Sequence, residues 1–515
     1  MPTPHAAYGP DPTRATTLPE LIRAAAHTYG DDPVVRLDEV DLTYRALERE
    51  SARRARGLLA AGVGKGTRIG VWFGNGPDWV IWWAAISRTG AVCVPLSTFL
   101  QPAELARVVR HVDLHGLVGT RAFLGRDFAE LLGAAFPTLG TAAGPVLALP
   151  EAPFLRFVAL DDGSPEPWCT PHSAIVAGGD DPVWAEVLAA AEAEVHEEDE
   201  AIVICTSGQS AEPKAVVHGH GAVLAKVHYL RDMYRFERGV HCRILLPFFW
   251  VGGLTMGLLP AMEAGGVAVC TDRSTWGSGQ VVGSAIEQEN PYAGMRMEPA
   301  LGMTETFGIY SWGDEWRVPG HPLCAPIDAL QPGIEMRVVD EGGDPVADGE
   351  RGEILLRGPS VTRRILKVAR AAAFDADGFY RTGDQAERDG ARFHFTGRIS
   401  DMIKTSGANV APAEVERELL ALPEVEVAHV VAVDDEERGQ IVGAAIVLVP
   451  GAMLTPAEVR ARLRDRLSSY KVPRAIVFLD SVDDVPMTPS TKVRRVELAA
   501  MIAAGAEPDA VTAAE

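Results

Sequence analysis

One segment combines the small hydroxylated residues, the glycine and the lysine that a phosphate-binding loop needs. It covers residues 205–214, reads CTSGQSAEPK, and follows an apolar run at 201–205 that predicts a strand. Such a loop can wrap a polyphosphate with backbone N–H groups and hydroxyls, while its lysine supplies a positive charge. The alternative is an ordinary polar turn. The segment is not the common P-loop, because the pattern GxxxxGK[ST] occurs nowhere in the chain.

Four further motifs follow this segment in order. They are GMTET at 302–306, YRTGD at 380–384, GRISDMIK at 397–404 and PSTK at 489–492. With these motifs the chain resembles the adenylate-forming superfamily, which comprises acyl-CoA synthetases, luciferases and the adenylation domains of peptide synthetases. LTY at 42–44 and NGPD at 75–78 also stand in family-like places, so the resemblance spans nearly the whole chain.

The resemblance assigns the phosphate chemistry to particular residues. In the family a carboxylate attacks the α-phosphorus of ATP while pyrophosphate leaves, so cations and donors must neutralise the phosphate oxygens. Glu305 matches the Mg²⁺-linked carboxylate and Thr304 a phosphate contact. Mg²⁺ prefers oxygen ligands and substrate phosphates, so one carboxylate suffices. The residues implied to cradle the triphosphate are Thr206, Ser207, Gly208, Gln209, Ser210 and Lys214.

Two residues match the nucleotide contacts of the family. Asp384 matches the aspartate that holds the ribose hydroxyls, a task that suits an acceptor-only group. Arg398 matches a nucleotide contact of the family, and its planar guanidinium suits ribose or phosphate oxygens. The alternatives are a turn cap for Asp384 and a surface salt bridge for Arg398.

Three positions match the family's C-terminal domain. Lys492 corresponds to the lysine that meets the reacting carboxylate and the α-phosphate, Asp401 to the hinge, and Gly407 to the glycine beside the pantetheine tunnel. Thr491 precedes the lysine where the family usually has glycine, which changes the backbone freedom of that turn. An exposed lysine and an ordinary turn glycine are the alternatives for Lys492 and Gly407.

The segment PFFWVGG at 247–253 resembles the motif that lines the acyl pocket. Trp250 stands where many members carry histidine, and Gly252 follows it. A large indole favours an apolar wall that faces a fatty or aromatic acid, and core packing is the alternative. The resemblance thus implies a free-standing acid:CoA ligase that uses ATP, Mg²⁺ and CoA.

The spacing between Trp250 and Gly302 departs from the family, because the segment between 285 and 300 is shortened. Removing strands from a parallel sheet would expose its edges and delete pocket walls. A second hypothesis is therefore that the chain is a truncated relative of the family, catalytically weak or inactive, that binds a nucleotide or an acyl group.

The elements that must position these residues alternate between helix and strand. A helical pattern opens at Thr43, and a strand at 69–73, a helix at 79–88 and a strand at 91–96 follow, which predicts parallel βαβ units. Residues 161–181, rich in proline, glycine and acidic residues, are predicted as a surface loop.

Length and composition shifts predict more than one domain, and the resemblance implies what these domains are and where they meet. A chain of 515 residues is too long for one ordinary core. We predict an α/β fold with an N-terminal AMP-binding domain of βαβ sheets over 1–397. Short β-rich segments at 335–339, 353–357 and 392–395 predict a β-rich subdomain at about 325–397. A small mobile α+β C-terminal domain is predicted over 398–515, ending in an acidic tail.

Charge and cysteine content limit the partners and the compartment. The net charge of −22 argues against a nucleic-acid partner. Six cysteines without a CxxC pair fit a reducing cytoplasm. The apolar stretch at 79–96 is interrupted by Arg88, so no membrane span is expected, and the N-terminus lacks a secretory pattern. The expected partners are a small-molecule acid, ATP and CoA, with a homodimer as an option.

Overall fold

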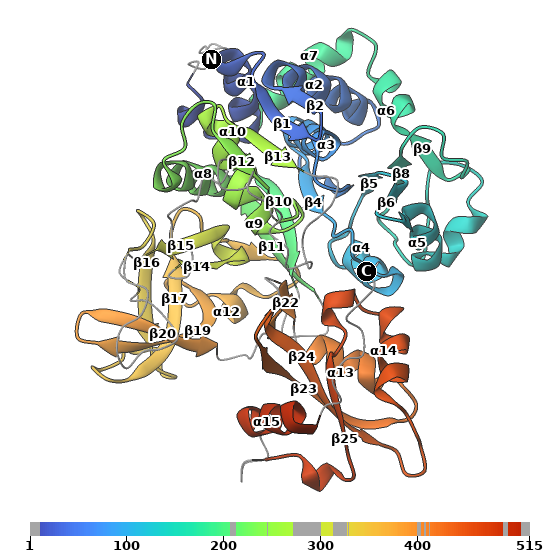
Figure 1. Ribbon diagram of the computed structural model, residues 1–515. Helices are drawn as coiled ribbons and strands as arrows, with labels where there is room; N and C mark the ends of the chain where they lie inside the picture. The colour runs from blue at the N-terminus through green and yellow to red at the C-terminus, as the bar shows by residue number, and fades with distance from the viewer. Residues whose placement is uncertain are drawn as a thin grey trace. The chain divides into compact units, whose positions relative to one another are not determined.

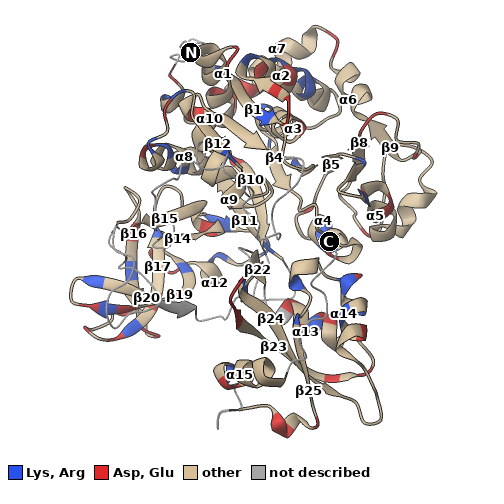
Figure 2. Cartoon of the chain, in the orientation of Figure 1, with Lys and Arg blue, Asp and Glu red and all other residues tan. Residues whose placement is uncertain are grey.

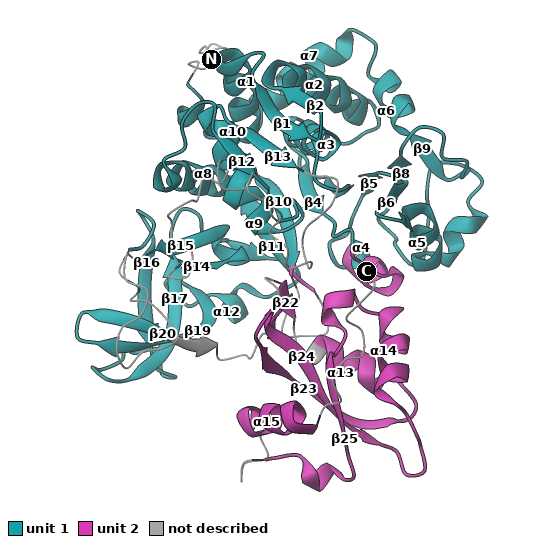
Figure 3. Ribbon diagram, viewed as in Figure 1, with its two compact units in different colours: residues 1–98, 109–205, 215–397 teal, residues 99–108, 206–214, 398–515 magenta. Residues whose placement is uncertain are grey.

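The computed structural model divides the chain into two compact units. The described residues are 11–206, 213–244, 246–270, 300–312, 327, 329–398, 403–405, 408–410, 412–487 and 493–505. The first unit comprises residues 1–98, 109–205 and 215–397, and the second comprises residues 99–108, 206–214 and 398–515 (Figure 3). Each unit has its own apolar core.

An eight-stranded sheet in the order β18-β11-β10-β4-β3-β5-β8-β9 dominates the first unit (Figure 1). Its strands are β3 (Arg68–Trp72), β4 (Val92–Pro95), β5 (Gly116–Gly119), β8 (Phe157–Leu160), β9 (Cys169–Pro171), β10 (Glu200–Thr206), β11 (Lys214–Gly219) and β18 (Arg364–Ile365). β3 pairs in parallel with both β4 and β5, and the helix α3 (Pro77–Arg88) connects β3 to β4. The predicted βαβ unit is therefore confirmed. Every residue of β4 and β5 is buried, as parallel strands covered on both faces require.

A second sheet of the first unit has the order β12-β13-β1-β2. Its strands are β1 (Pro33–Leu37), β2 (Val40–Thr43), β12 (His241–Arg243) and β13 (Val267–Cys270). The helix α2 (Tyr44–Ala60) begins where β2 ends, and the side chain of Thr43 caps it by accepting from the Ala46 amide. The predicted helix start at Thr43 is thus confirmed. The buried Tyr44 hydroxyl donates to the Gly266 carbonyl at 2.7 Å and ties α2 to the residue that precedes β13.

The other longer helices of the first unit surround these sheets (Figure 1). They are α1 (Leu18–Tyr29), α5 (Phe128–Ala135), α6 (His172–Gly178), α7 (Val183–Ala193), α8 (His220–Tyr234) and α10 (Leu259–Ala264). The helix α4 (Pro102–His111) is divided between the units, and its residues 102–108 belong to the second one. The prediction of a surface loop over 161–181 is wrong, because β9 and α6 lie within it. Trp168 and Cys169 are buried there, and their apolar side chains add β9 to the edge of the sheet beside β8.

A smaller antiparallel sheet, β16-β17-β19-β20, follows in the first unit. Its strands are β16 (Glu335–Val339), β17 (Arg351–Arg357), β19 (Tyr380–Asp389) and β20 (Arg392–Arg398), and the short helix α12 (Arg370–Ala373) precedes β19. The three predicted strands are confirmed as β16, β17 and β20. The long strand β19 contains the YRTGD motif. A two-stranded hairpin of β14 (Ala300–Met303) and β15 (Gly308–Trp312) carries the GMTET motif.

The second unit is built on a five-stranded sheet in which β22, β21, β24 and β23 are neighbours and β25 pairs with β24. Its elements are β21 (Ile403–Thr405), β22 (Ala408–Val410), α13 (Pro412–Leu420), β23 (Val425–Asp435), β24 (Gly439–Leu448), α14 (Pro456–Arg464), β25 (Ala475–Leu479) and α15 (Arg495–Gly505). Thr455 and Glu458 form a capping box at the start of α14. Within this unit the buried Lys471 ammonium donates to Glu104 at 2.8 Å and to Glu414 at 3.0 Å.

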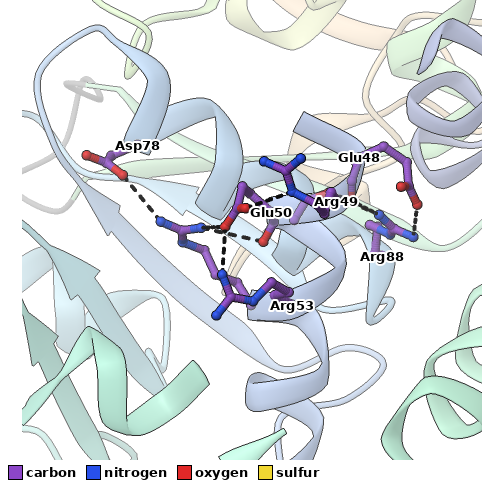
Figure 4. A network of polar contacts seen from close by, with 8 residues as sticks. Glu48, Arg49, Glu50, Arg53, Asp78 and Arg88 are labelled. Atoms are coloured by element: carbon purple, nitrogen blue, oxygen red, sulfur yellow. Dashed lines mark hydrogen bonds and ion pairs between the residues drawn. The ribbon is translucent and has the colours of Figure 1, made fainter. Parts of the chain in front are cut away.

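A buried arginine links three helices of the first unit. The Arg88 guanidinium on α3 contacts the Glu192 carboxylate on α7. It also lies 3.0 Å from the Glu48 carboxylate on α2 (Figure 4). Arg88 is 3% exposed and Glu192 is 4% exposed, so neither charge is solvated. The Glu192 carboxylate also accepts from Arg23 at 2.9 Å. Because a buried charge without a partner is strongly destabilising, these ion pairs favour the packing of α2, α3 and α7 against one another.

Basic and acidic residues are interspersed along many of the described helices and strands (Figure 2). None of the helices in the described part of the chain combines the length and the apolar character that a membrane crossing requires.

Replacing Arg88 with alanine is expected to lower the free energy of unfolding by roughly 3 kcal/mol, because it leaves a buried glutamate without one of its partners. The matched control is Arg53→Ala, which removes an exposed pair with Glu50 at 3.3 Å (Figure 4) and should change stability by less than about 1 kcal/mol. Guanidinium unfolding followed by tryptophan fluorescence measures both variants. Equal losses in the two variants would contradict this account.

Candidate active site

Glu305 lies on the tight turn η4 (Thr304–Thr306) between β14 and β15, where 8% of the residue is exposed. The hydroxyl of Tyr380 on β19 donates to Oε1 of Glu305 at 2.9 Å. The backbone amide of Thr362 donates to the Glu305 carbonyl at 2.7 Å. Because a buried carboxylate needs hydrogen-bond donors around it, these contacts fix where the Glu305 side chain and its backbone lie.

The turn that carries Glu305 is also fixed from β11. The imidazole Nε2 of His218 lies 2.7 Å from the Thr304 carbonyl oxygen, and since a carbonyl only accepts, Nε2 carries the proton. The ring also makes an edge contact with Phe307, at 5.0 Å between ring centroids. Phe307 has a φ of 50°, a left-handed conformation that reverses the chain directly after Glu305.

Burial makes His218 a neutral residue. Desolvation, with a smaller contribution from the nearby Lys226, lowers the pKa of His218 to about 4. The Thr304 carbonyl and Glu305 act in the opposite direction without restoring the ordinary value. The Nδ1 atom is buried and has no hydrogen-bond partner in the part of the chain that the structure describes. His218 is therefore a neutral donor to the turn at physiological pH.

Asp384 lies four residues after Tyr380 on the same strand and is buried. Its backbone amide donates to the Thr382 hydroxyl at 3.0 Å, and that hydroxyl donates to the Ile354 carbonyl at 2.5 Å. Gly383 between them has a φ of 70°, which favours glycine. The motif at 380–384 is thus a rigid, irregular part of β19 that presents two buried polar side chains.

The phosphate-loop residues are described only at the two ends of the loop. Thr206 is the last residue of β10, Lys214 is the first residue of β11, and both are partly exposed. The loop residues Ser207, Gly208, Gln209 and Ser210 lie outside the described residues.

Other predicted positions fall outside the described residues as well. They are Asp401, Gly407, Lys492 and residues 285–299 of the shortened segment. For Arg398 only the backbone, at the end of β20, is described.

Trp250 and Gly252 lie on a tightly packed turn at the start of the short helix α9 (Val251–Gly253). The Trp250 ring makes an edge contact with Phe249, at 5.7 Å between ring centroids. A Cβ atom on Gly253 would lie 2.0 Å from the Pro247 carbonyl oxygen, so only glycine fits there. Asn75 binds the backbone just before Trp250 with two hydrogen bonds. Its side chain donates to the Leu246 carbonyl at 3.0 Å and accepts from the Phe248 amide at 2.8 Å.

Within the described residues there is no group of three or more histidine, cysteine or acidic side chains that could hold a metal ion. Glu305 is thus a single hard-oxygen donor. That donor set fits Mg²⁺, which is commonly held by one or two carboxylates together with substrate phosphates.

Three positioning residues were missed by sequence reasoning. Tyr380 stands inside a motif that was read only for its aspartate, and Asn75 stands inside NGPD, which was noted only as family-like. His218 offered no signal beyond its place four residues after Lys214. A search for polar residues inside buried strands would have found His218 and Tyr380.

Comparison with protein families gives two matches. A family model described as AMP-binding enzyme matches residues 22–293 and 275–366. A second model, described as AMP-binding enzyme C-terminal domain, matches residues 414–492.

Curated relatives align along most of the chain. An acyl-CoA ligase, sidI, of Aspergillus fumigatus is 28% identical and covers 94% of this chain and 90% of its own length. A feruloyl-CoA synthase of an Amycolatopsis species is 29% identical, with coverage of 89% and 93%. An indoleacetate–CoA ligase of Aromatoleum aromaticum is 26% identical, with coverage of 94% and 98%.

Solved structures confirm the predicted fold class. An o-succinylbenzoate CoA synthetase from Bacillus subtilis, a double mutant bound to a product analogue, has a TM-score of 0.68 at 20% identity and covers 93% of this chain and 97% of its own. An amide bond synthetase from Marinactinospora thermotolerans has a TM-score of 0.70 at 21% identity, with coverage of 93% and 99%.

The depressed pKa of His218 predicts acid sensitivity. An unfolded histidine takes up a proton below about pH 6.5, whereas folded His218 does so only near pH 4, so stability should fall as pH drops from about 6.5 to about 4. His220, whose pKa burial also lowers to about 4, adds to the same effect. Replacing His218 with glutamine, which keeps an N–H donor, should remove roughly 3 kcal/mol of this pH-dependent loss.

Urea unfolding between pH 4.5 and pH 7.5 measures how the free energy of unfolding depends on pH in the wild-type protein and in His218→Gln. At pH 7.5 His218 and its glutamine replacement are both neutral, so the two free energies should differ there by a constant amount. Parallel curves throughout the range would show that His218 does not titrate in this way.

Proposed function

The chain belongs to the AMP-binding enzymes, and on that premise we propose that it is an acid:CoA ligase that activates a hydrophobic carboxylic acid with ATP. The observation that carries the proposal is the buried Glu305 carboxylate on a fixed turn, in a chain that matches both AMP-binding models. The relatives described as CoA ligases and synthases, which align over most of their own length, support the same reaction and give no support to an inactive relative.

The reaction has two steps. In the first, a carboxylate oxygen of the acid attacks the α-phosphorus of ATP, the bond to the bridging oxygen breaks, and pyrophosphate leaves the acyl-adenylate behind. In the second, the thiol of CoA loses its proton and attacks the acyl carbon, and AMP leaves with the bonding electrons. The products are the thioester, AMP and pyrophosphate.

The roles follow from the chemistry of the side chains. Glu305 would hold Mg²⁺, which when bound neutralises the triphosphate charge, and Thr304 would contact a phosphate. Asp384 would accept hydrogen bonds from the ribose hydroxyls, and Arg398 would contact the nucleotide. The loop from Thr206 to Lys214 would surround the phosphates with donors, and Lys492 would contact the reacting carboxylate and the α-phosphate.

The acid is a fatty or aromatic one. Trp250 and Phe249 supply apolar rings on a turn that cannot accept a larger residue at Gly253. The relatives include a feruloyl-CoA synthase and an indoleacetate–CoA ligase, whose substrates are aromatic acids. Gly407 at the CoA tunnel, a cytoplasmic location and a homodimer stay predictions.

Replacing Lys492 with alanine is expected to reduce acid-dependent exchange of labelled pyrophosphate into ATP by at least about 100-fold, because the α-phosphate loses a preplaced cation. Arg494→Ala is the matched control, since Arg494 stands two residues after Lys492 in the sequence and pairs with Glu497 at 2.9 Å. The assay uses a panel of fatty and aryl acids. Absence of exchange by the folded wild-type protein across the whole panel would overturn the ligase proposal.

Replacing Asp401 with proline is expected to spare pyrophosphate exchange but slow thioester formation by about tenfold or more, because proline fixes φ at a hinge. Asp401→Gly leaves the backbone mobile and should support both steps. Thioester formation is followed by the loss of free CoA thiol. Equal loss of both half-reactions in the proline variant would contradict the hinge role.

A further inference from the structure

The backbone around Glu305 is held from two separate elements. The Thr362 amide donates to the Glu305 carbonyl at 2.7 Å, and the Thr362 hydroxyl donates to the Val217 carbonyl on β11 at 2.7 Å. His218, the next residue on β11, holds the Thr304 carbonyl at 2.7 Å. The peptide groups on both sides of the Glu305 Cα atom are therefore tied to β11, directly or through Thr362.

With the backbone fixed, the remaining freedom of Glu305 is the rotation of its side chain. Tyr380 restricts this rotation, because its hydroxyl donates to Oε1 at 2.9 Å. Tyr380 is itself 1% exposed, pairs with Leu356 in the sheet and makes an edge contact with Phe374 at 5.5 Å between ring centroids. A buried tyrosine ring has few accessible rotamers, so it holds its hydroxyl in one place.

The strand that carries Tyr380 also carries Asp384, and both side chains are buried. The turn that is proposed to hold Mg²⁺ and the aspartate that is proposed to hold the ribose are thus connected through one strand. A nucleotide that contacts both would meet two groups that are linked by β19 and by the hydrogen bond from Tyr380 to Glu305.

We propose that Tyr380 is a positioning residue that orients the Glu305 carboxylate toward Mg·ATP, an inference that rests on the proposed function. Residues that orient a metal ligand in this way typically change metal affinity by about 10–100-fold when they are replaced. Tyr380 acts through Glu305, so its effect should depend on Mg²⁺ and on the carboxylate. A purely structural role would weaken nucleotide binding equally with and without Mg²⁺.

The test compares Tyr380→Phe with Tyr44→Phe. Each substitution deletes one buried phenolic hydroxyl, but the Tyr44 hydroxyl donates to the Gly266 carbonyl and not to Glu305. Calorimetric titration with a non-hydrolysable ATP analogue, with and without Mg²⁺, gives the factor by which Mg²⁺ strengthens binding. That factor should fall by about tenfold or more in Tyr380→Phe and stay unchanged in Tyr44→Phe. Circular dichroism and the unfolding midpoint confirm that both variants are folded.

A double-variant cycle with Glu305→Gln provides a second measurement. In the Glu305→Gln background the further change Tyr380→Phe should leave the Mg²⁺ factor unaltered, because the carboxylate through which Tyr380 acts is gone. If the wild-type protein shows the Mg²⁺ factor and Tyr380→Phe retains it fully, the positioning role is overturned while the proposed function stands. If the wild-type protein binds no nucleotide, the proposed function is overturned together with this inference.

Discussion

Burial of the Glu305 carboxylate is the constraint on which the arrangement of the candidate site depends. With 8% of the residue exposed, the acidic group relies on donors inside the protein, since a buried polar group without partners is strongly unfavourable. The Tyr380 hydroxyl on β19 donates to its carboxylate, and the Thr362 amide, before β18, donates to its carbonyl. The His218 imidazole on β11 donates to the carbonyl of the preceding residue. Strands that are far apart in the sequence must therefore be placed correctly for one side chain.

The regular elements could largely be predicted from the sequence. The spacing of apolar residues and the capping residues predicted α2 with its Thr43 cap, the unit from β3 to β4, and the strands β16, β17 and β20. They could do so because the local sequence pattern determines which face of each element is buried. The prediction of a loop over 161–181 was wrong because its proline, glycine and acidic residues are typical of loops, whereas the segment contains β9 and α6. Its buried apolar side chains, Trp168, Cys169 and Ile175, are too few to produce a periodic pattern.

The candidate site could be predicted only as a set of residues. The motifs identified Glu305 and Asp384, but no local pattern states that Tyr380 reaches a carboxylate 75 positions earlier or that His218 holds a carbonyl 86 positions later. Such contacts are decided by how separate strands pack, which a motif does not contain. Roles that depend on Lys492, Asp401 and Gly407 stay predictions, because these residues lie outside the described part of the chain.

The two hydrogen bonds of Asn75 have a consequence for how such a chain could change over evolution. The amide of Asn75 fixes the turn before Trp250 through the backbone of residues 246 and 248, without using their side chains. These two hydrogen bonds therefore do not depend on which side chains residues 246 and 248 carry, whereas Gly253 further along admits only glycine. The residues that hold Glu305 belong to other strands and are not involved. A lineage could therefore acquire a new acid preference at the turn and inherit its phosphate chemistry unchanged, so that the two properties diverge at different rates.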